Sequence, residues 1–159
     1  KCLGLGLEGI FAKNLEKPYM AGQRDFAWIK LKKNYTEGKL DSFDLCVMGY
    51  FYGKGKNKTM PSSLLCGTYD SETNTYYAIA KVGSGLTEEN MVFFKKEFEN
   101  ITILKKPFNY NTDLEPDVYV QPKFVIEVLC DEITNSPLYK GKKGYSLRFP
   151  RFISLREGL

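Results

Sequence analysis

The sequence predicts an all-β chain with one helix, in which five short strands form a Greek-key barrel preceded by a β-hairpin. Short runs of β-branched and aromatic residues recur along the chain, separated by turns rich in Gly, Pro, Asn and Asp. Only residues 87–100 carry apolar side chains every three or four positions, the pattern of an amphipathic helix. Because this helix falls between the third and fourth barrel strands, the layout is that of an OB-fold.

The composition is that of an ordinary globular protein, with 159 residues, 43% hydrophobic and 26% charged. No apolar run reaches the roughly 18 residues that a membrane-spanning helix needs, so we expect no membrane segment. The four cysteines match no zinc-binding spacing, and three lie in apolar runs. We therefore expect small buried side chains in a reducing compartment at Cys2, Cys46, Cys66 and Cys130.

Positive charge is concentrated near the N-terminus. Residues 1–33 hold seven Lys or Arg and three Asp or Glu, whereas residues 34–159 hold sixteen of each. The whole net charge of +4 therefore comes from the first fifth of the chain. Histidine is absent, which excludes an imidazole general base or metal ligand from these residues.

Two strands are expected in this basic segment, "GLEGIFAK" (6–13) and "FAWIKLKK" (26–33), joined as a hairpin by a long polar loop. Because strand side chains alternate, Trp28, Lys30 and Lys32 share one face. The two lysines are about 7 Å apart along the strand, a spacing that suits two contacts around one phosphate. An edge strand that uses lysines against aggregation is the alternative.

A linker, residues 34–42, precedes five or more short strands, the layout of the five-stranded barrel. Strand-like runs are expected at 43–53, 62–70, 75–83, 118–122, 124–133 and 146–157. Thr87 is the expected N-cap of the helix, followed by acidic residues in the first turn and ending near Asn100. Pro150 limits how far the last strand can run. Aromatic side chains in these strands could stack on bases, but in so small a barrel we expect most of them in the core.

Three basic, glycine-bearing segments are candidates for contact with phosphates, since glycine lets a backbone approach closely. They are "YGKGKNKT" (52–59), "KVGSG" (81–85) and "YKGKKGYSLR" (139–148). Solvated basic turns, and a glycine joint into the helix, are the alternatives. The candidate residues are Lys54, Lys56, Lys58, Lys81, Gly83, Ser84 and Arg148. Contacts of this kind bind the nucleic-acid backbone and do not read base sequence.

Taken in order, "EGIFAK", "WIKLKK", "DLCVMGYFYGKGK", "KVGSG" and "SLRFPRFISLRE" resemble the C-terminal part of ATP-dependent DNA ligases, of the archaeal and eukaryotic replicative type. The resemblance covers essentially the whole chain. It implies that residues 1–34 are the last strands of a nucleotidyltransferase (adenylation) domain, and that residues 35–159 are an OB-fold DNA-binding domain. The N-terminal hairpin is then what remains of the adenylation domain.

The resemblance also implies roles for individual residues. Glu8 matches a glutamate that helps to hold the metal and the nucleotide, with Lys13 at the other end of its strand, and Lys30 and Lys32 match lysines that contact the nucleotide phosphates. The closing basic segment, which orients the pyrophosphate of ATP, carries Arg151 and Arg156. The seven residues of the basic segments would contact the DNA backbone.

For the full-length enzyme, the family implies sealing of nicks in duplex DNA through enzyme–AMP and DNA–adenylate intermediates, with ATP and Mg²⁺. The implied partners are nicked duplex DNA and a sliding clamp bound through regions outside these residues. The compartment would be cytoplasmic in an archaeon or nuclear in a eukaryote.

Two departures from the family pattern stand out. The sequence has no KxDG motif, which carries the nucleophilic lysine of the family. The near match "KLDS" (39–42) has Ser in place of Gly and lies after "WIKLKK", whereas the family has the motif far before "EGIFAK". Gly158 and Leu159 stand where the family has Asp–Lys. Since the chain also lacks an initiator Met, we expect a fragment that is inactive alone. The alternatives are a relative of capping enzymes or RNA ligases, and a stand-alone single-strand-binding OB module, which leaves "EGIFAK" and "WIKLKK" unexplained.

Overall fold

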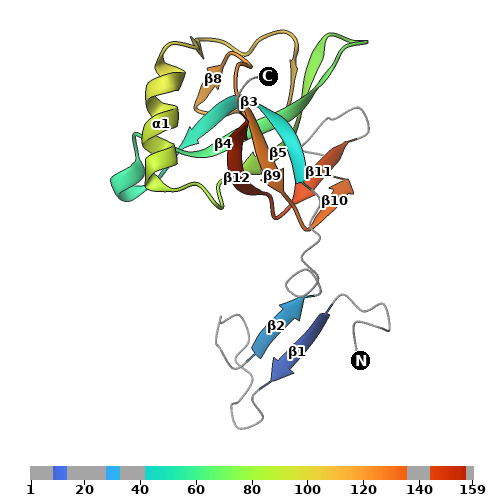
Figure 1. Cartoon of the computed structure of the whole chain (residues 1–159). Coiled ribbons are helices and arrows are strands. Elements are labelled where there is room, and N and C mark those ends of the chain that lie inside the picture. The colour runs from blue at the N-terminus through green and yellow to red at the C-terminus, as the bar shows by residue number, and fades with distance from the viewer. Residues whose placement is uncertain (1–8, 14–27, 33–41, 136–143, 157–159) are drawn as a thin grey trace. The chain divides into compact units, whose positions relative to one another are not determined.

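The structure is a computed structural model, which describes residues 9–13, 28–32, 42–135 and 144–156. The chain divides into two compact units, Lys1–Leu40 and Asp41–Leu159 (Figure 1). Each unit is described by itself.

The described part of the first unit is a two-stranded antiparallel ladder. Strand β1 spans Gly9–Lys13 and strand β2 spans Trp28–Lys32. This ladder confirms the hairpin predicted from the alternating pattern. The predicted linker and the hairpin loop lie outside the described residues.

The second unit is a curled sheet in which the main strands follow the order β12-β9-β3-β4-β5 (Figure 1). These strands are β3 (Ser42–Tyr52), β4 (Pro61–Asp70), β5 (Thr75–Val82), β9 (Val125–Leu129) and β12 (Arg151–Arg156). The two ends of this order meet at a parallel bridge between Ser84 and Arg151, where the Phe152 amide donates to the Ser84 carbonyl at 2.8 Å. The predicted five-stranded Greek-key barrel of the OB-fold is therefore confirmed.

Helix α1, Glu88–Glu99, lies between β5 and β9 in the chain, as predicted. Its start is fixed by a reciprocal cap, because Thr87 Oγ1 accepts from the Asn90 amide at 3.2 Å and Asn90 Oδ1 accepts from the Thr87 amide at 3.0 Å. Phe94 and Phe98, one turn apart, are buried against the barrel. Local sequence therefore sets both the position of the helix and the face it buries.

Several short elements complete the unit. They are the 3₁₀ turn η3 (Gly55–Asn57) and strands β6 (Thr102–Ile103), β7 (Tyr110–Asn111), β8 (Val118–Val120), β10 (Glu132–Asn135) and β11 (Tyr145–Arg148). The single strand expected at 124–133 is thus divided into β9 and β10. The strand expected at 146–157 is divided at Phe149, whose φ is 51°, and Pro150, as the proline indicated.

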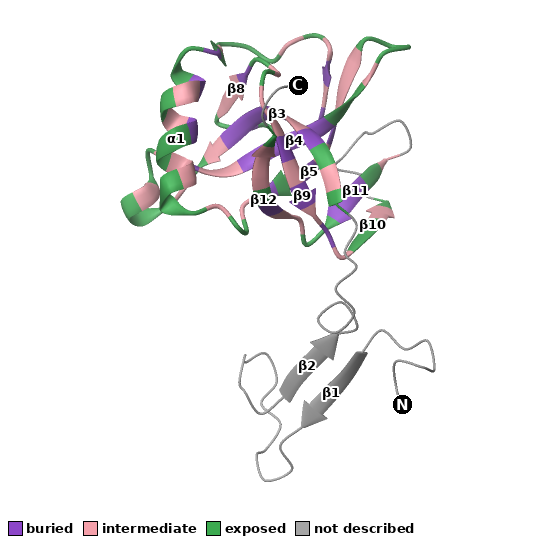
Figure 2. Ribbon diagram, in the orientation of Figure 1, coloured by how far each residue is buried: buried purple, intermediate pink, exposed green. Residues whose placement is uncertain are grey.

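The buried residues, purple in Figure 2, form two apolar clusters. Val47 belongs to one and its chain neighbour Met48 to the other, so the clusters lie on opposite faces of β3. The larger one fills the barrel and includes Tyr50, which stacks on Phe98, so this aromatic residue belongs to the core. The smaller one centres on Met48 and Tyr110 and lies under the segment that carries β7 and β8. Among the described residues, no helix is long and apolar enough to cross a membrane.

Three of the four cysteines lie in the second unit. Cys66 and Cys130 are buried and Cys46 is half-buried. Burial raises the pKa of the Cys46 thiol to about 12 and that of Cys66 well above its ordinary value. These thiols therefore stay protonated and unreactive at neutral pH, as expected for small core side chains. Cys2 lies outside the described residues.

Candidate nucleic-acid interface

A basic turn follows β3. Its backbone is tied by hydrogen bonds from the Gly53 amide to the carbonyls of Asn57 at 3.1 Å and Met60 at 3.2 Å, and Gly55 supplies a positive φ of 59°. Three lysines are carried outward by this turn and are exposed, namely Lys54, Lys56 and Lys58. The sequence-predicted lysines are therefore presented together to solvent.

One of these lysines is paired with a carboxylate. The Lys56 ammonium forms an ion pair with Glu88 in the first turn of α1, which raises the pKa of Lys56 and lowers that of Glu88. Both side chains are largely exposed, so the pair contributes little stability. Among the described residues, no carboxylate pairs with Lys54 or Lys58, which leaves their charges available to an anion.

Lys81 lies on β5, which β4 separates from β3 in the sheet. Its ammonium is 3.7 Å from the centre of the Phe51 ring, a cation–π contact that orients the side chain without neutralising it. Lys81 is exposed, and within the described part of the chain it has no carboxylate partner. A phosphate can therefore reach this charge.

The glycine joint after β5 meets the last strand of the barrel. Gly83 is followed by Ser84, which forms the parallel bridge to Arg151. Gly85 has a φ of +87°, and a Cβ placed on it would lie 2.3 Å from the Phe152 carbonyl oxygen. The barrel can therefore close in this way only with glycine at position 85. The same joint brings Ser84, a predicted DNA-contact residue, next to Arg151, a predicted nucleotide-contact residue.

The arginines of the closing segment all lie beside carboxylates. Arg151 donates to Asp131 at 3.0 Å, and Arg148 forms an ion pair with Glu132 and lies over the ring of Phe149, 5.3 Å from its centre. These contacts hold β11 and β12 to the segment after β9. The guanidinium groups can bind a phosphate only by sharing or exchanging these partners.

Arg156 is held by two carboxylates from different strands. Its Nε donates to Asp44 Oδ1 at 2.8 Å, and its Nη2 lies 3.3 Å from Glu127 Oε1. The hydrogen bond that Arg156 donates to Asp44 is the main cause of the raised pKa of Arg156. Ser154 also donates to Glu127, at 3.1 Å. The cluster of Asp44, Glu127 and Arg156 carries a net charge of −1, which opposes the approach of a free anion.

In the first unit, backbone register places three predicted basic residues on the ladder. Lys30 is opposite Phe11, Lys32 is opposite Gly9, and Lys13 is opposite Trp28. Directly opposed residues lie on the same face of an antiparallel pair, and so do alternate residues of one strand. All three lysines therefore occupy positions on one face. Glu8, the predicted metal and nucleotide residue, lies outside the described residues.

Sequence reasoning did not find the carboxylates that hold the arginines. Asp44, Glu127 and Asp131 read as ordinary strand and turn residues, and no local pattern links them to partners far along the chain. Across the described ranges, no group of three or more Cys, Asp or Glu residues could hold a metal ion. The described part of the candidate site thus consists of exposed lysines and of arginines held by carboxylates.

Comparison with known families identifies this arrangement. The family model described as "ATP dependent DNA ligase C terminal region" matches residues 57–158. The chain belongs to this family. The matched range begins within the basic turn, after Lys54 and Lys56, and includes Lys58, Lys81, the barrel closure and the closing arginines.

Relatives from bacteria, archaea and a eukaryote are similar over nearly the whole chain. A "Probable DNA ligase" of Dictyoglomus thermophilum is 46% identical over 157 residues, which are 95% of this chain and 27% of that protein. A "DNA ligase" of Sulfolobus acidocaldarius is 41% identical, covering 96% of this chain and 27% of the relative. "DNA ligase 1" of Schizosaccharomyces pombe is 42% identical, over 94% of this chain and 21% of that protein. The chain thus spans about a quarter of the length of these ligases.

A solved structure supports the fold. The ligase domain from M. tuberculosis LigD superposes with a TM-score of 0.57 at 26% identity, covering 97% of this chain and 46% of that one. The confirmed OB-fold and the ligase family therefore agree.

Proposed function

We propose that this chain is the C-terminal region of an ATP-dependent DNA ligase, and that the full-length protein seals nicks in duplex DNA. The observation that carries the proposal is the family match over residues 57–158. In this reaction a lysine outside these residues attacks the α-phosphorus of ATP and expels pyrophosphate. The AMP then passes to the 5′-phosphate at the nick, and the 3′-hydroxyl attacks that phosphate and releases AMP.

In the proposed function the first unit supports nucleotide binding. The one-face placement of Lys13, Lys30 and Lys32 suits contact with the phosphates of ATP, which they position and neutralise without acting as nucleophile. In this proposal Glu8 helps to bind the metal and the nucleotide. Mg²⁺ would neutralise charge on the transferring phosphates. Residues 1–34 and 35–159 would be the adenylation and DNA-binding parts, and the fragment alone would be inactive.

The barrel would bind the backbone of the nicked duplex. The charges of Lys54, Lys58 and Lys81 support this, because each is exposed and unpaired among the described carboxylates. Lys56, Gly83, Ser84 and Arg148 would add contacts around them. Arg151 and Arg156 would turn toward pyrophosphate only by leaving or sharing their carboxylates. A sliding clamp, bound elsewhere in the full-length protein, and an intracellular, reducing compartment complete the proposal.

The test is salt-dependent binding of the 159-residue chain to labelled nicked duplex and to single-stranded DNA. We expect weak binding with a preference for the nicked duplex. The triple variant Lys54→Gln, Lys58→Gln and Lys81→Gln should flatten the plot of log affinity against log salt by about 0.9 per lost contact.

A matched double variant, Lys96→Gln and Lys123→Gln, removes exposed lysines elsewhere on the barrel unit and should change the slope less for each lysine removed. A clear preference for single strands would instead favour a stand-alone single-strand-binding module. Equal slopes per lysine in the two variants would refute the proposed surface.

A further inference from the structure

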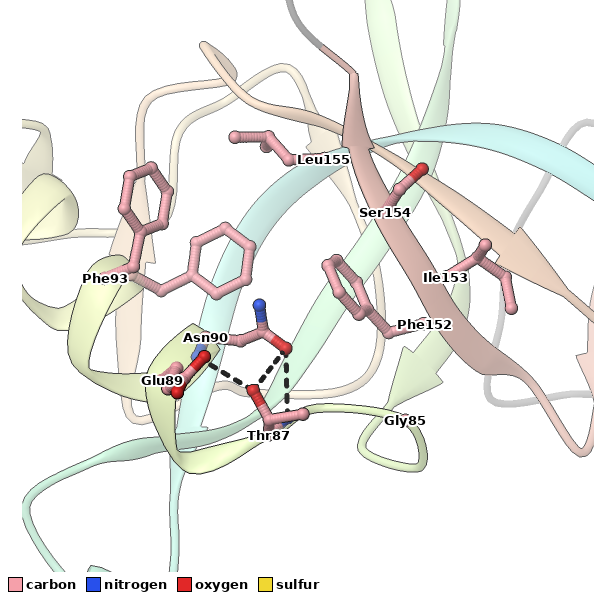
Figure 3. Close-up of a pocket in the computed structure, with 10 residues that line it drawn as sticks. Gly85, Thr87, Glu89, Asn90, Phe93, Phe152, Ile153, Ser154 and Leu155 are labelled. Carbon is pink, nitrogen blue, oxygen red and sulfur yellow. Dashed lines mark hydrogen bonds between the residues drawn. The ribbon is translucent and has the colours of Figure 1, made fainter.

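A groove of about 450 Å³ runs between α1 and β12 on the barrel unit (Figure 3). Phe94 and Phe152, whose rings meet edge to face at 6.0 Å, are buried at its base. Phe93 and Leu155 line its walls, and the Phe93 side chain remains 40% exposed. The helix side ends in polar groups at Thr87, Glu89 and Asn90. An apolar floor with an acidic rim is therefore open to solvent.

One wall of this groove is the edge of a strand. β12 pairs with β9 along one side, and on its other side the described residues give it only the isolated bridge between Arg151 and Ser84, which follows β5. Beyond that bridge, described residues 153–156 make no ladder contact on this side. An unpaired strand edge offers a row of backbone donors and acceptors that can pair with another chain.

A β-bulge interrupts the pairing of β12 with β9. The pairing of β12 with β9 shifts between Phe152 and Ser154, so Ile153 has no opposite residue in that described ladder. Figure 3 shows the Ile153 side chain on the opposite side of the β12 ribbon from Phe152, although Ile153 lines the groove. The strand backbone thus forms this part of the wall, with apolar side chains on either side of it.

We propose that this groove binds an extended peptide segment of a partner protein, which adds as a strand to the free edge of β12. Alternate apolar side chains of the segment would lie over Phe93, Phe152 and Leu155. Among the described residues that line the groove, Glu89 is the charged one and none is Lys or Arg, so the segment carries a basic residue at that end. This proposal goes beyond DNA sealing and does not depend on it.

The probe is a blocked peptide of about seven residues, the length of a typical strand, that alternates valine and threonine and carries lysine at both ends. Titrated into the ¹⁵N-labelled 159-residue chain, it should shift the amide signals of Ile153, Ser154 and Leu155 saturably. A peptide N-methylated at alternate residues loses the donors of one edge and should bind at least about tenfold more weakly. Replacing its lysines with glutamate should also weaken binding.

Phe93→Glu should weaken binding about tenfold, because it removes apolar contact and adds negative charge. Phe108→Glu is the matched control, since Phe108 is 97% exposed and does not line the groove. Thermal unfolding of both variants checks that the fold persists. The proposal is overturned if the probe gives no saturable shifts at β12. It is equally overturned if the N-methylated peptide binds as well as its parent, or if the two variants behave alike. Binding to nicked DNA, measured in parallel, reports on the proposed function separately.

Discussion

At the scale of single residues, the predicted contact residues fall into two groups. Lys54, Lys58 and Lys81 are exposed, and no described carboxylate neutralises them. Arg151 and Arg156 are instead held by carboxylates of neighbouring segments. A phosphate gains full Coulomb attraction from the lysines but must compete for the arginines. In this conformation the lysines therefore offer the more accessible positive charge, and the arginines hold the last strand to its neighbours.

The Lys56–Glu88 pair gives a prediction for pH. Because Lys56 lowers the folded-state pKa of Glu88 below its ordinary value of 4.5, the pair adds stability above that value. This contribution is lost as the pH falls through the lowered pKa. Lys56→Met should raise the Glu88 pKa toward 4.5, measured by NMR titration of the Glu88 carboxyl carbon.

Lys58→Met is the control for this titration, since Lys58 lies in the same turn but does not pair with Glu88. It should leave the Glu88 pKa close to that of the parent chain. If both substitutions move the pKa equally, the general field of the basic turn, and not the ion pair, lowers it.

At the scale of elements, the start of α1 depends on its cap. Thr87→Ala removes the hydroxyl that accepts from the Asn90 amide, so it should cost about 1 kcal/mol of unfolding free energy. Urea denaturation followed by circular dichroism measures the change. Thr59→Ala is the control, because Thr59 is an exposed turn residue without a side-chain hydrogen bond among the described residues, and it should change stability by less than about 0.5 kcal/mol. Equal effects of the two substitutions would contradict the role of the cap.

Elements with local signals were predictable from the sequence. The helix was predicted within a residue at each end, because a cap and an apolar stripe define it. The break at Pro150 was predictable for the same reason. The division of the strand expected at 124–133 was not, since the apolar run continues to Cys130. There the Asp131 amide donates to the carbonyl of Arg148, a long-range contact that no local pattern reveals.

The candidate site was predictable only where its residues lie close together in the sequence. Lysines on glycine-bearing turns are visible in the sequence, and the structure shows them exposed. The clamp on Arg156 was not visible, because Asp44 lies 112 residues earlier in the chain. Only the strand order of the barrel brings β3, β9 and β12 side by side. Ion pairs across a Greek-key barrel therefore require the structure.

At the scale of the whole molecule, the described apolar core and the net positive charge lie in different parts of the chain. Among the residues whose burial the structure describes, both apolar clusters consist of residues from 43 onward, all of them in the second unit. Residues 41–159 hold fifteen Lys or Arg and fifteen Asp or Glu, so the net charge of +4 resides entirely in residues 1–40. The stability of the barrel and the overall attraction to DNA should therefore separate on truncation.

A chain of residues 41–159 should unfold cooperatively in urea, with a midpoint close to that of the barrel transition in the full chain. Its affinity for nicked duplex DNA should fall, and its salt dependence should weaken, because net positive charge no longer steers association. The full chain with Lys30→Gln and Lys32→Gln is the matched comparison, since it removes charge without removing the unit. If the truncated chain loses cooperative unfolding, the barrel needs the first unit for stability. If it keeps the full salt slope, all phosphate contacts lie on the barrel, and the hairpin lysines are left to the nucleotide.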